Sequence, residues 1–368
     1  MALGSLAALL LAEGAFRILD IKATEPGRIF RISNGPDVLF PGRAGHTVID
    51  LYPTNPRRSF PIDLTSSETR ERLIAENFSR VDEARRTNPA GVVFKYNSRG
   101  FREREFTPKP PGTKRVVFVG DSFTEGMGVM EPFSSVRLAE GLLRRKEGSV
   151  EAFNLGVRAL DFPQLEELID PALELSPDAV ILALVLNDAD RDQELTSRWP
   201  RVNDWIMVRQ KAPTWIERHS YLAGFLANRY ENYQASRDAT AWYRSLYSDE
   251  NRGGWMSTRA SLNRIREKLG KKGVPFGVAL WPLLVGLEPG REYPFEAAHA
   301  QIKKGVERSG IPFVDLLPAL KGRDSASLWV HPSDLHPNEI AQGLVAPVLA
   351  EFAYHRLQEA ANQKPVAK

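Results

Sequence analysis

The sequence contains no cysteine among its 368 residues. Disulfide bonds, thiolate nucleophiles and cysteine-based zinc sites are therefore excluded. An absence of cysteine fits the cytoplasm and an exported compartment equally well. Any nucleophile in this chain must be a residue of another type.

The chain also lacks a strong charge imbalance, because its formal net charge is only +3 at pH 7. Its cations lie in short clusters, such as residues 144–146, near predicted helix ends where they complement the helix dipole. No basic stripe is interleaved with aromatic residues, which is the pattern typical of nucleic-acid-binding surfaces. We therefore expect no nucleic-acid partner.

A run of about 20 apolar residues, the length needed to span a bilayer, is missing as well. Residues 2–12 are apolar, but Glu13 interrupts the run before residues 16–19 resume it. Two interpretations of residues 1–22 stay open: a packed N-terminal helix, or the distal half of a membrane anchor that begins further upstream. The anchor would attach the protein to a membrane, facing the periplasm or the exterior, whereas the packed helix leaves a cytoplasmic location open.

Nucleotide and metal motifs fail on their spacing. Gly126 and Gly128 are followed by Glu131 where a dinucleotide fingerprint needs its third glycine. Residues 188–192 resemble the start of a calcium loop, but Gln193 replaces the required glycine. We expect neither a cofactor nor a bound metal.

With 42% hydrophobic and 26% charged residues, the composition is that of a globular protein with a sizeable core. Residues 23–112 are rich in Gly, Pro, Asn and Arg and contain short strand-like pieces, so we assign them to an N-terminal extension. A proline-rich linker at 107–114 leads into a domain that we place at 113–360, and residues 361–368 form a tail.

From residue 115 onward, continuous apolar runs alternate with stretches of helical period. The runs are RVVFVG, EAFNLG, DAVILALVL, VPFGVALWPLL and IPFVDLLP. Such runs are typical of strands covered on both faces, and their alternation with helices predicts a parallel α/β sheet with right-handed connections. The interval of about 189–262 breaks this rhythm and reads as a helical insertion that carries five of the seven tryptophans.

Polar residues follow the apolar runs at the points where the strands end, which is where open α/β sheets bind ligands. A serine nucleophile needs a base within hydrogen-bond reach and a third group that orients this base. The oxyanion needs donors such as a backbone N–H, a glycine N–H and a side-chain amide. Residues from four separate parts of the chain supply these groups: Ser122, His336, Asp334, Gly156 and Asn187.

The segments GDSFTEG, Asn-x-Gly of FNLG, Asn-Asp of VLND and DLHPN resemble, in this order, the conserved blocks of the SGNH (GDSL-type) hydrolases. The resemblance implies a flavodoxin-like three-layer α/β/α fold with a five-stranded parallel sheet. It implies Ser122 as nucleophile, His336 as base, and an oxyanion hole made by Ser122 N–H, Gly156 N–H and the Asn187 amide. The segment FKYNSRGFRERE (94–105) is similar to the one preceding the catalytic domain in bacterial, often membrane-anchored, members.

Two departures from the family pattern affect these assignments. Val185 stands where the third block has a glycine, and Ser333 stands where the last block has an aspartate three residues before the histidine. Asp334 lies two residues before His336 instead. Either Asp334 orients the imidazole from a different turn, or Ser122 and His336 act as a dyad assisted by a backbone carbonyl.

Two of the assigned residues have simpler alternatives. A serine after a strand is commonly the N-cap of the next helix, and His331 lies beside the same aspartate as His336. The presence of all four blocks in order favours Ser122 as nucleophile. The position directly before the final helix favours His336 as base.

We expect a serine esterase that removes an acyl group from a carbohydrate or cell-envelope polymer, and we expect this acyl group to be acetyl. Three alternatives stay open: an O-acyltransferase using the same site, a lipase or acylhydrolase, and a non-catalytic glycan-binding module. The expected partner is an acylated small molecule or glycan. The Trp, Tyr and Arg residues of the insertion favour polar glycans over acyl tails, because aromatic faces stack on sugar rings and arginines pair with carboxylates.

Overall fold

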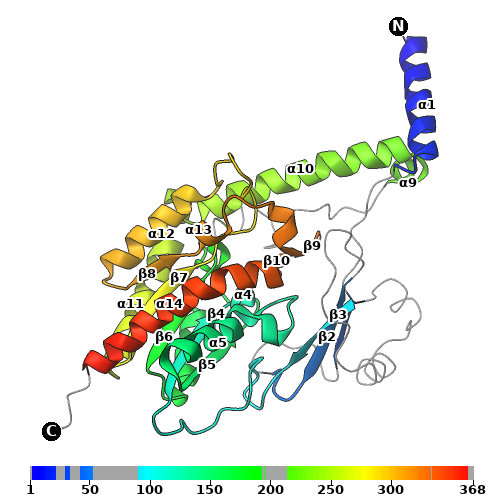
Figure 1. Ribbon diagram of the computed structural model, residues 1–368. Helices are drawn as coiled ribbons and strands as arrows, with labels where there is room; N and C mark the ends of the chain where they lie inside the picture. Colours follow the sequence, from blue (N-terminus) through cyan, green and yellow to red (C-terminus); the bar gives the residue numbers. More distant parts are fainter. Residues whose placement is uncertain are drawn as a thin grey trace, which may run out of the picture. The chain divides into compact units, whose positions relative to one another are not determined.

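The computed structural model describes residues 2–21, 30–33, 42–52, 90–192, 195, 214–332 and 334–363 (Figure 1). The helix predicted at 66–86 and the last residues of the tail, 364–368, lie outside the described residues. The chain forms two compact units. The smaller contains Met1–Pro26 and Gln193–Tyr243, and the larger contains Gly27–Asp192 and Arg244–Lys368.

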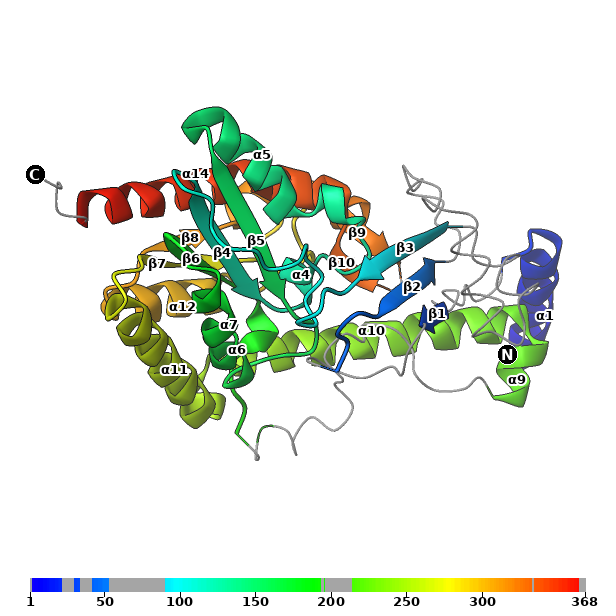
Figure 2. The same cartoon turned by 90° about the horizontal axis from the view of Figure 1, so that it is seen from below.

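A parallel sheet of five strands forms the centre of the larger unit (Figure 2). Its strands are β4 (Lys114–Gly120), β5 (Val150–Gly156), β6 (Ala179–Leu184), β7 (Phe276–Leu280) and β8 (Phe313–Asp315). Every residue of β6 and β7 is buried, as expected of strands covered on both faces. The strand order β5-β4-β6-β7-β8 is the flavodoxin-like order, so the predicted fold is confirmed.

Helices cover both faces of this sheet (Figures 1 and 2). One layer contains α5 (Ser135–Glu147) and α14 (Glu339–Gln363), with α13 (Leu317–Leu320) packed on α14. The other contains α6 (Gln164–Glu167), α7 (Ile169–Glu174), α11 (Arg252–Gly270) and α12 (Glu296–Arg308). Helix α11 begins within the interval that the sequence marks as an insertion, and it covers β7 as part of the connection from β6.

The strand order reverses around β4, because the chain runs outward to β5 and then returns past β4 to β6. Gly120 at the end of β4 is paired with Gly156 of β5 on one side and with Ala183 of β6 on the other. The carboxyl ends of these three strands therefore meet at one edge. Open α/β sheets bind their ligands at this kind of switch point. Two short helices begin there, α4 (Ser122–Glu125) and η2 (Leu186–Asp188).

The N-terminal extension contributes a second, antiparallel sheet to the larger unit. Its strands, in spatial order, are β1 (Phe30–Ser33), β2 (Thr47–Tyr52) and β3 (Ala90–Lys95). They overlap the three strand-like pieces of residues 23–112 in the sequence, which are RIFRI, TVIDLYP and VVFKYN. A two-stranded pairing of β9 (Trp329–His331) with β10 (Asp334–Pro337) precedes α14. Single 3-10 turns complete the unit at η1 (Glu131–Phe133), η3 (Asp249–Asn251) and η4 (Ser325–Leu328).

The smaller unit contains α1 (Ala2–Ile18), α9 (Trp215–His219) and most of α10 (Tyr221–Ser245). The Glu13 carboxylate of α1 accepts hydrogen bonds from Tyr221 N–H and Leu222 N–H, and so caps the start of α10. Leu9, Leu10 and Ile18 of α1 remain exposed.

Within the part of the chain that the structure describes, no helix is both long enough and apolar enough to span a bilayer. Membrane attachment through residues 1–22 stays a prediction.

Candidate active site

Ser122 lies where the buried strand β4 gives way to the four-residue helix α4. Asp121 is the N-cap of this helix, because its Oδ1 accepts a hydrogen bond from Phe123 N–H at 2.9 Å. Gly120 is required at the turn, since a Cβ there would lie 2.2 Å from Thr124 Oγ1 and 2.6 Å from Ala183 O. Asp121 therefore has the structural role expected of a cap, and the side chain of Ser122 is available for chemistry.

His336 and Asp334 lie next to Ser122, although they are more than 200 residues away in the chain. Ser122 Oγ is 2.9 Å from His336 Nε2, and His336 Nδ1 is 2.5 Å from Asp334 Oδ1. Ser122 Oγ also lies 3.3 Å from Asp121 Oδ2, so the hydroxyl has a second and more distant acceptor. Three buried side chains thus form one continuous line of hydrogen bonds.

The two-residue spacing of Asp334 and His336 suits the local backbone, because both residues lie in strand β10. Alternate residues of a strand point to the same face. In this extended backbone a separation of two residues lets the Asp334 carboxylate reach the imidazole of His336. Asp334 Oδ1 also accepts a hydrogen bond from the backbone N–H of His336 at 3.1 Å. Of the two open alternatives, the structure brings Asp334 to the imidazole. It also brings His336, not the rival His331, to Ser122.

The carboxyl groups around Ser122 differ in their electrostatics. Burial raises the pKa of Asp121 to about 6. Burial also acts to raise the pKa of Asp334, but the charge of His336 and the hydrogen bonds that Asp334 accepts outweigh it, and the net pKa is lowered. Burial and the nearby Asp121 charge raise the pKa of Asp188 well above its ordinary value. Asp334 is therefore the ionised carboxylate that an orienting residue must be at neutral pH.

Gly156, at the end of β5, has a packing role in this structure. Its N–H donates to Asn154 Oδ1 at 2.9 Å, so this donor is already occupied. A Cβ at position 156 would lie 2.1 Å from Glu125 N and 2.5 Å from Thr124 C, which shows how closely α4 approaches the end of β5. The predicted role of Gly156 N–H as an oxyanion donor stays a prediction.

Asn187 lies in η2, directly after the end of β6 and at the same edge as Ser122. Its side chain is buried, and among the described residues no partner is found for its Oδ1. Val185, which replaces the glycine of the family pattern, donates its N–H to Asp188 Oδ2 at 2.8 Å and so starts the turn. Ser333, the other departure, lies outside the described residues.

The sequence analysis missed a buried ion pair at the end of α4, the helix that begins with Ser122. Glu125, the last residue of α4, accepts hydrogen bonds at Oε2 from both the Nε and the backbone N–H of Arg158, each at 2.8 Å. Tyr96 of the extension donates to Glu125 Oε1 at 2.7 Å. A charged residue within an otherwise buried block was the signal available for Glu125, but the sequence did not show its partners.

The segment 97–105 contacts the turn and loop that follow Ser122. Arg102 is buried and donates to the carbonyl oxygens of Glu125, Gly126 and Val129, which belong to the turn and loop after Ser122. The guanidinium also lies over the ring of Phe94, 4.0 Å from its centroid. Arg102 therefore ties β3 and the nucleophile loop together.

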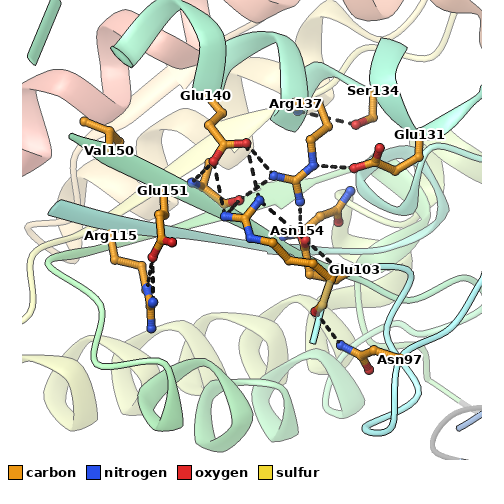
Figure 3. Close-up of polar contacts among 12 residues, drawn as sticks. Asn97, Glu103, Arg115, Glu131, Ser134, Arg137, Glu140, Val150, Glu151 and Asn154 are labelled. Atoms are coloured by element: carbon orange, nitrogen blue, oxygen red, sulfur yellow. Dashed lines mark hydrogen bonds and ion pairs between the residues drawn. The ribbon is translucent and has the colours of Figure 1, made fainter. Parts of the chain in front are cut away.

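Glu103, in the same segment, joins the extension to β5 (Figure 3). Its Oε2 accepts from Asn154 N–H at 2.6 Å and also from Arg137 of α5. Arg137 in turn pairs with Glu140 at 2.6 Å. The segment that resembles the upstream part of family members is thus packed against the strands that carry the candidate site.

The tryptophans of the insertion have different environments. Trp199 and Trp205 lie outside the described residues. In the larger unit, Trp255 is buried and makes an edge-to-face contact with Tyr247 at 5.2 Å. In the smaller unit, Trp215 is exposed and stacks on His219 at 4.4 Å. Trp255 therefore contributes to the packing of the larger unit, whereas the side chain of Trp215 is accessible to solvent.

No three His, Asp or Glu side chains gather into a metal-binding group within the described ranges. The site that the structure does show is a serine–histidine–aspartate arrangement at the switch point of a parallel sheet.

A comparison with protein-family models identifies one family. The model of the GDSL-like Lipase/Acylhydrolase family matches residues 118–343. No curated protein sequence matches the chain.

Several solved structures are similar. They include the lipase/acylhydrolase from Enterococcus faecalis (15% identity, TM-score 0.39, covering 66% of this chain and 97% of that one). Axe2, an acetylxylan esterase from Geobacillus stearothermophilus, is another (15% identity, TM-score 0.39, covering 67% and 94%). An acetyl xylan esterase, AlAXEase, is a third (16% identity, TM-score 0.37, covering 65% and 98%). Similarity at this level carries no information on substrate. The family match, which extends over more than half of the sequence, shows that the chain belongs to the GDSL-like lipase/acylhydrolase family.

Proposed function

We propose that the protein is a serine esterase that hydrolyses O-acyl esters, with Ser122 as nucleophile, His336 as general base and Asp334 as the residue that orients His336. The observation that carries this proposal is the line of hydrogen bonds from Ser122 Oγ to His336 Nε2 at 2.9 Å and from His336 Nδ1 to Asp334 Oδ1 at 2.5 Å. A serine becomes a useful nucleophile when a base within hydrogen-bond reach accepts its proton and a third group holds the base.

The reaction follows from these contacts. Ser122 Oγ attacks the acyl carbon while its proton passes to His336 Nε2, and Asp334 stabilises the imidazolium that forms. The tetrahedral intermediate collapses when His336 returns the proton to the leaving alcohol oxygen, which leaves an acyl group on Ser122. A water molecule then attacks this acyl-enzyme while His336 accepts its proton. The second tetrahedral intermediate collapses as His336 gives this proton to Ser122 Oγ, the bond from Ser122 Oγ to the acyl carbon breaks, and the free carboxylic acid is released.

Two donors are proposed for the oxyanion, the N–H of Ser122 and the side-chain amide of Asn187. Both residues lie at the carboxyl ends of neighbouring strands, where preorganised donors are most effective in stabilising developing negative charge. The third donor that the family resemblance implies, Gly156 N–H, would have to exchange or share its hydrogen bond with Asn154 Oδ1, which already accepts from it.

We propose acetyl as the preferred acyl group and a carbohydrate or envelope polymer as its carrier. Ser122 is only 4% exposed. Because little space is open around an enclosed nucleophile, a short acyl group is favoured. The content of Trp, Tyr and Arg in residues 189–262 of the sequence supports a polar, ring-containing substrate.

Labelling with a fluorophosphonate, followed by peptide mass spectrometry, tests the nucleophile. We expect the label on Ser122 and no hydrolysis of p-nitrophenyl acetate by Ser122→Ala. Ser309→Ala is the matched control, since Ser309 is buried but donates to Gly305 O in α12. Full activity of Ser122→Ala would overturn the proposal.

The acyl preference is tested with p-nitrophenyl acetate and p-nitrophenyl octanoate, each with and without a sugar acceptor. We expect faster turnover of the acetyl ester and release of free acetate in the presence of the sugar. Transfer of the acetyl group to the sugar would identify an O-acyltransferase, and faster turnover of octanoate would identify a lipase.

A further inference from the structure

Tyr52 of the N-terminal extension reaches the candidate active site. It is the last residue of β2, it is fully buried, and its hydroxyl donates to Asp334 Oδ2 at 3.2 Å across 282 positions of the chain. Tyr52 lies in no conserved block of the family that the sequence showed. Its contact with the site arises only from the packing of the antiparallel sheet.

The two oxygens of Asp334 have different partners. Oδ1 accepts from the Nδ1 and the backbone N–H of His336, whereas Oδ2 accepts from Tyr52. A carboxylate held at one oxygen can still turn about its Cβ–Cγ bond, and a second donor at the other oxygen fixes its plane. We propose that Tyr52 is a positioning residue that holds Asp334 in the plane in which it orients His336. This inference rests on the proposed roles of Ser122, His336 and Asp334.

Asp334 needs support from outside its own strand. Strand β10 has four residues, its pairing partner β9 has three, and their register shifts between Asp334 and Pro337. An isolated two-stranded pairing is marginally stable by itself. The extension supplies the missing support, because β2 is the central strand of a three-stranded sheet.

Packing keeps the hydroxyl of Tyr52 close to Asp334. Tyr52 belongs to a buried apolar cluster that also includes Val129, from the loop after the nucleophile, and Val330, from β9. Gly128 has a φ of +73°, and a Cβ there would lie 2.9 Å from the Tyr52 hydroxyl oxygen. Tyr52 thus packs against the loop that follows α4 and against β9, the strand paired with β10.

Tyr52 also remains a donor over the working pH range. Burial, together with the negative charges of Asp334 and Asp50, raises the pKa of Tyr52 well above its ordinary value, although the positive charge of Arg158 acts in the opposite direction. A neutral phenol donates one hydrogen bond, and Asp334 Oδ2 receives it.

The test is Tyr52→Phe in the full-length protein, which removes the hydroxyl and keeps the ring. We expect kcat for p-nitrophenyl acetate to fall about 10-fold with KM unchanged, in keeping with the loss of a hydrogen bond to a charged group. Without this hydrogen bond the negative charge of Asp334 is less stabilised, so the Asp334–His336 pair binds a proton more tightly. The acidic limb of the kcat/KM profile should therefore move to higher pH.

Tyr96→Phe is the matched control. Tyr96 lies in the same buried cluster, but its hydroxyl donates to Glu125 Oε1 at 2.7 Å and not to Asp334. We expect Tyr96→Phe to lower the midpoint of thermal unfolding without moving the acidic limb. An identical pH profile for Tyr52→Phe and the wild type would overturn the inference, as would an equal shift in both variants.

A double-mutant cycle with Asp334→Asn separates positioning from general destabilisation. If Tyr52 acts through Asp334, adding Tyr52→Phe to Asp334→Asn should change kcat less than 2-fold, because interacting residues are not additive. Full additivity of the two effects would refute the inference.

Failure of this inference can be told apart from failure of the proposed function. If Ser122→Ala is inactive and Tyr52→Phe has the same kcat and pH profile as the wild type, only the role of Tyr52 is refuted. If Ser122→Ala keeps full activity, NMR titration of the His336 ring in both tyrosine variants still decides whether Tyr52 acts on the Asp334–His336 pair. A titration midpoint that moves to higher pH in Tyr52→Phe alone supports the inference, and unchanged midpoints refute it.

Discussion

Glu125→Gln tests whether the buried ion pair at the end of α4 stabilises the fold. Glu125 is 1% exposed and receives four hydrogen bonds, three from Arg158 and one from Tyr96. Glutamine has nearly the same shape but no charge. The substitution would leave the Arg158 guanidinium buried with a more distant counter-charge, Asp50 Oδ2 at 3.7 Å.

The size of the effect follows from the pKa of Glu125. Burial alone would raise this pKa, but the charge and hydrogen bonds of Arg158 outweigh burial and lower it from 4.5 to about 2. A shift of this size corresponds to about 3 kcal/mol of stability, which falls within the range of about 3–5 kcal/mol for breaking a buried ion pair. Because the pKa is lower in the folded protein, this stabilisation is complete above pH 4.5 and is lost as the pH falls through about 2.

Urea denaturation of the wild type and of Glu125→Gln, from pH 7 downward, measures this difference. We expect a loss of about 3 kcal/mol at pH 7 that shrinks as the pH approaches 2. Glu174→Gln is the control, because Glu174 pairs with Arg99 at the surface, where such pairs are worth about 1 kcal/mol or less. The reasoning fails if both variants lose the same stability, or if the Glu125→Gln difference does not depend on pH.

Four further predictions concern the site and the N-terminus. Asn187→Ala should lower kcat by about 10²–10³-fold, the usual loss for one oxyanion donor, in steady-state assays with p-nitrophenyl acetate. His336→Ala should abolish hydrolysis in the same assay while His331→Ala keeps most of it, and the opposite ranking would show that the base is misassigned. Gly156→Ala should lower the yield of folded protein, as judged by circular dichroism, because its Cβ would overlap the backbone of α4. Deletion of residues 2–18 should leave kcat unchanged, since this helix belongs to the smaller unit, and a large loss of activity would contradict that expectation.

Much of the fold could be predicted from the sequence because its signals are local. The apolar runs correspond to β4 to β8, and they are continuous because these strands are covered on both faces. The three short pieces of the extension correspond to β1, β2 and β3. Ser122 and His336 were also predictable, since each lies in a short block whose order along the chain is typical of the family.

The role of Asp334 was open because spacing alone does not reveal the backbone conformation. Two residues of separation place Asp334 and His336 on one face only if the segment is extended, and the structure shows that it lies in β10. The role of Gly156 stays open for a related reason. Whether an N–H is free depends on the rotamer of a neighbouring side chain, here Asn154, which accepts this hydrogen bond.

The sequence by itself determined the parallel sheet, the position of Ser122 at the end of a strand and the residue types of the candidate site. Only the tertiary structure decided which residues support them, because those contacts join distant parts of the chain. Tyr52 meets Asp334 over 282 positions, and Arg158 meets Glu125 over 33. Local propensity and periodicity carry no record of such pairs. The contact of Tyr52 with Asp334 forms because the antiparallel sheet of the extension packs its apolar side chains against Val129, in the loop after Ser122, and against Val330 of β9.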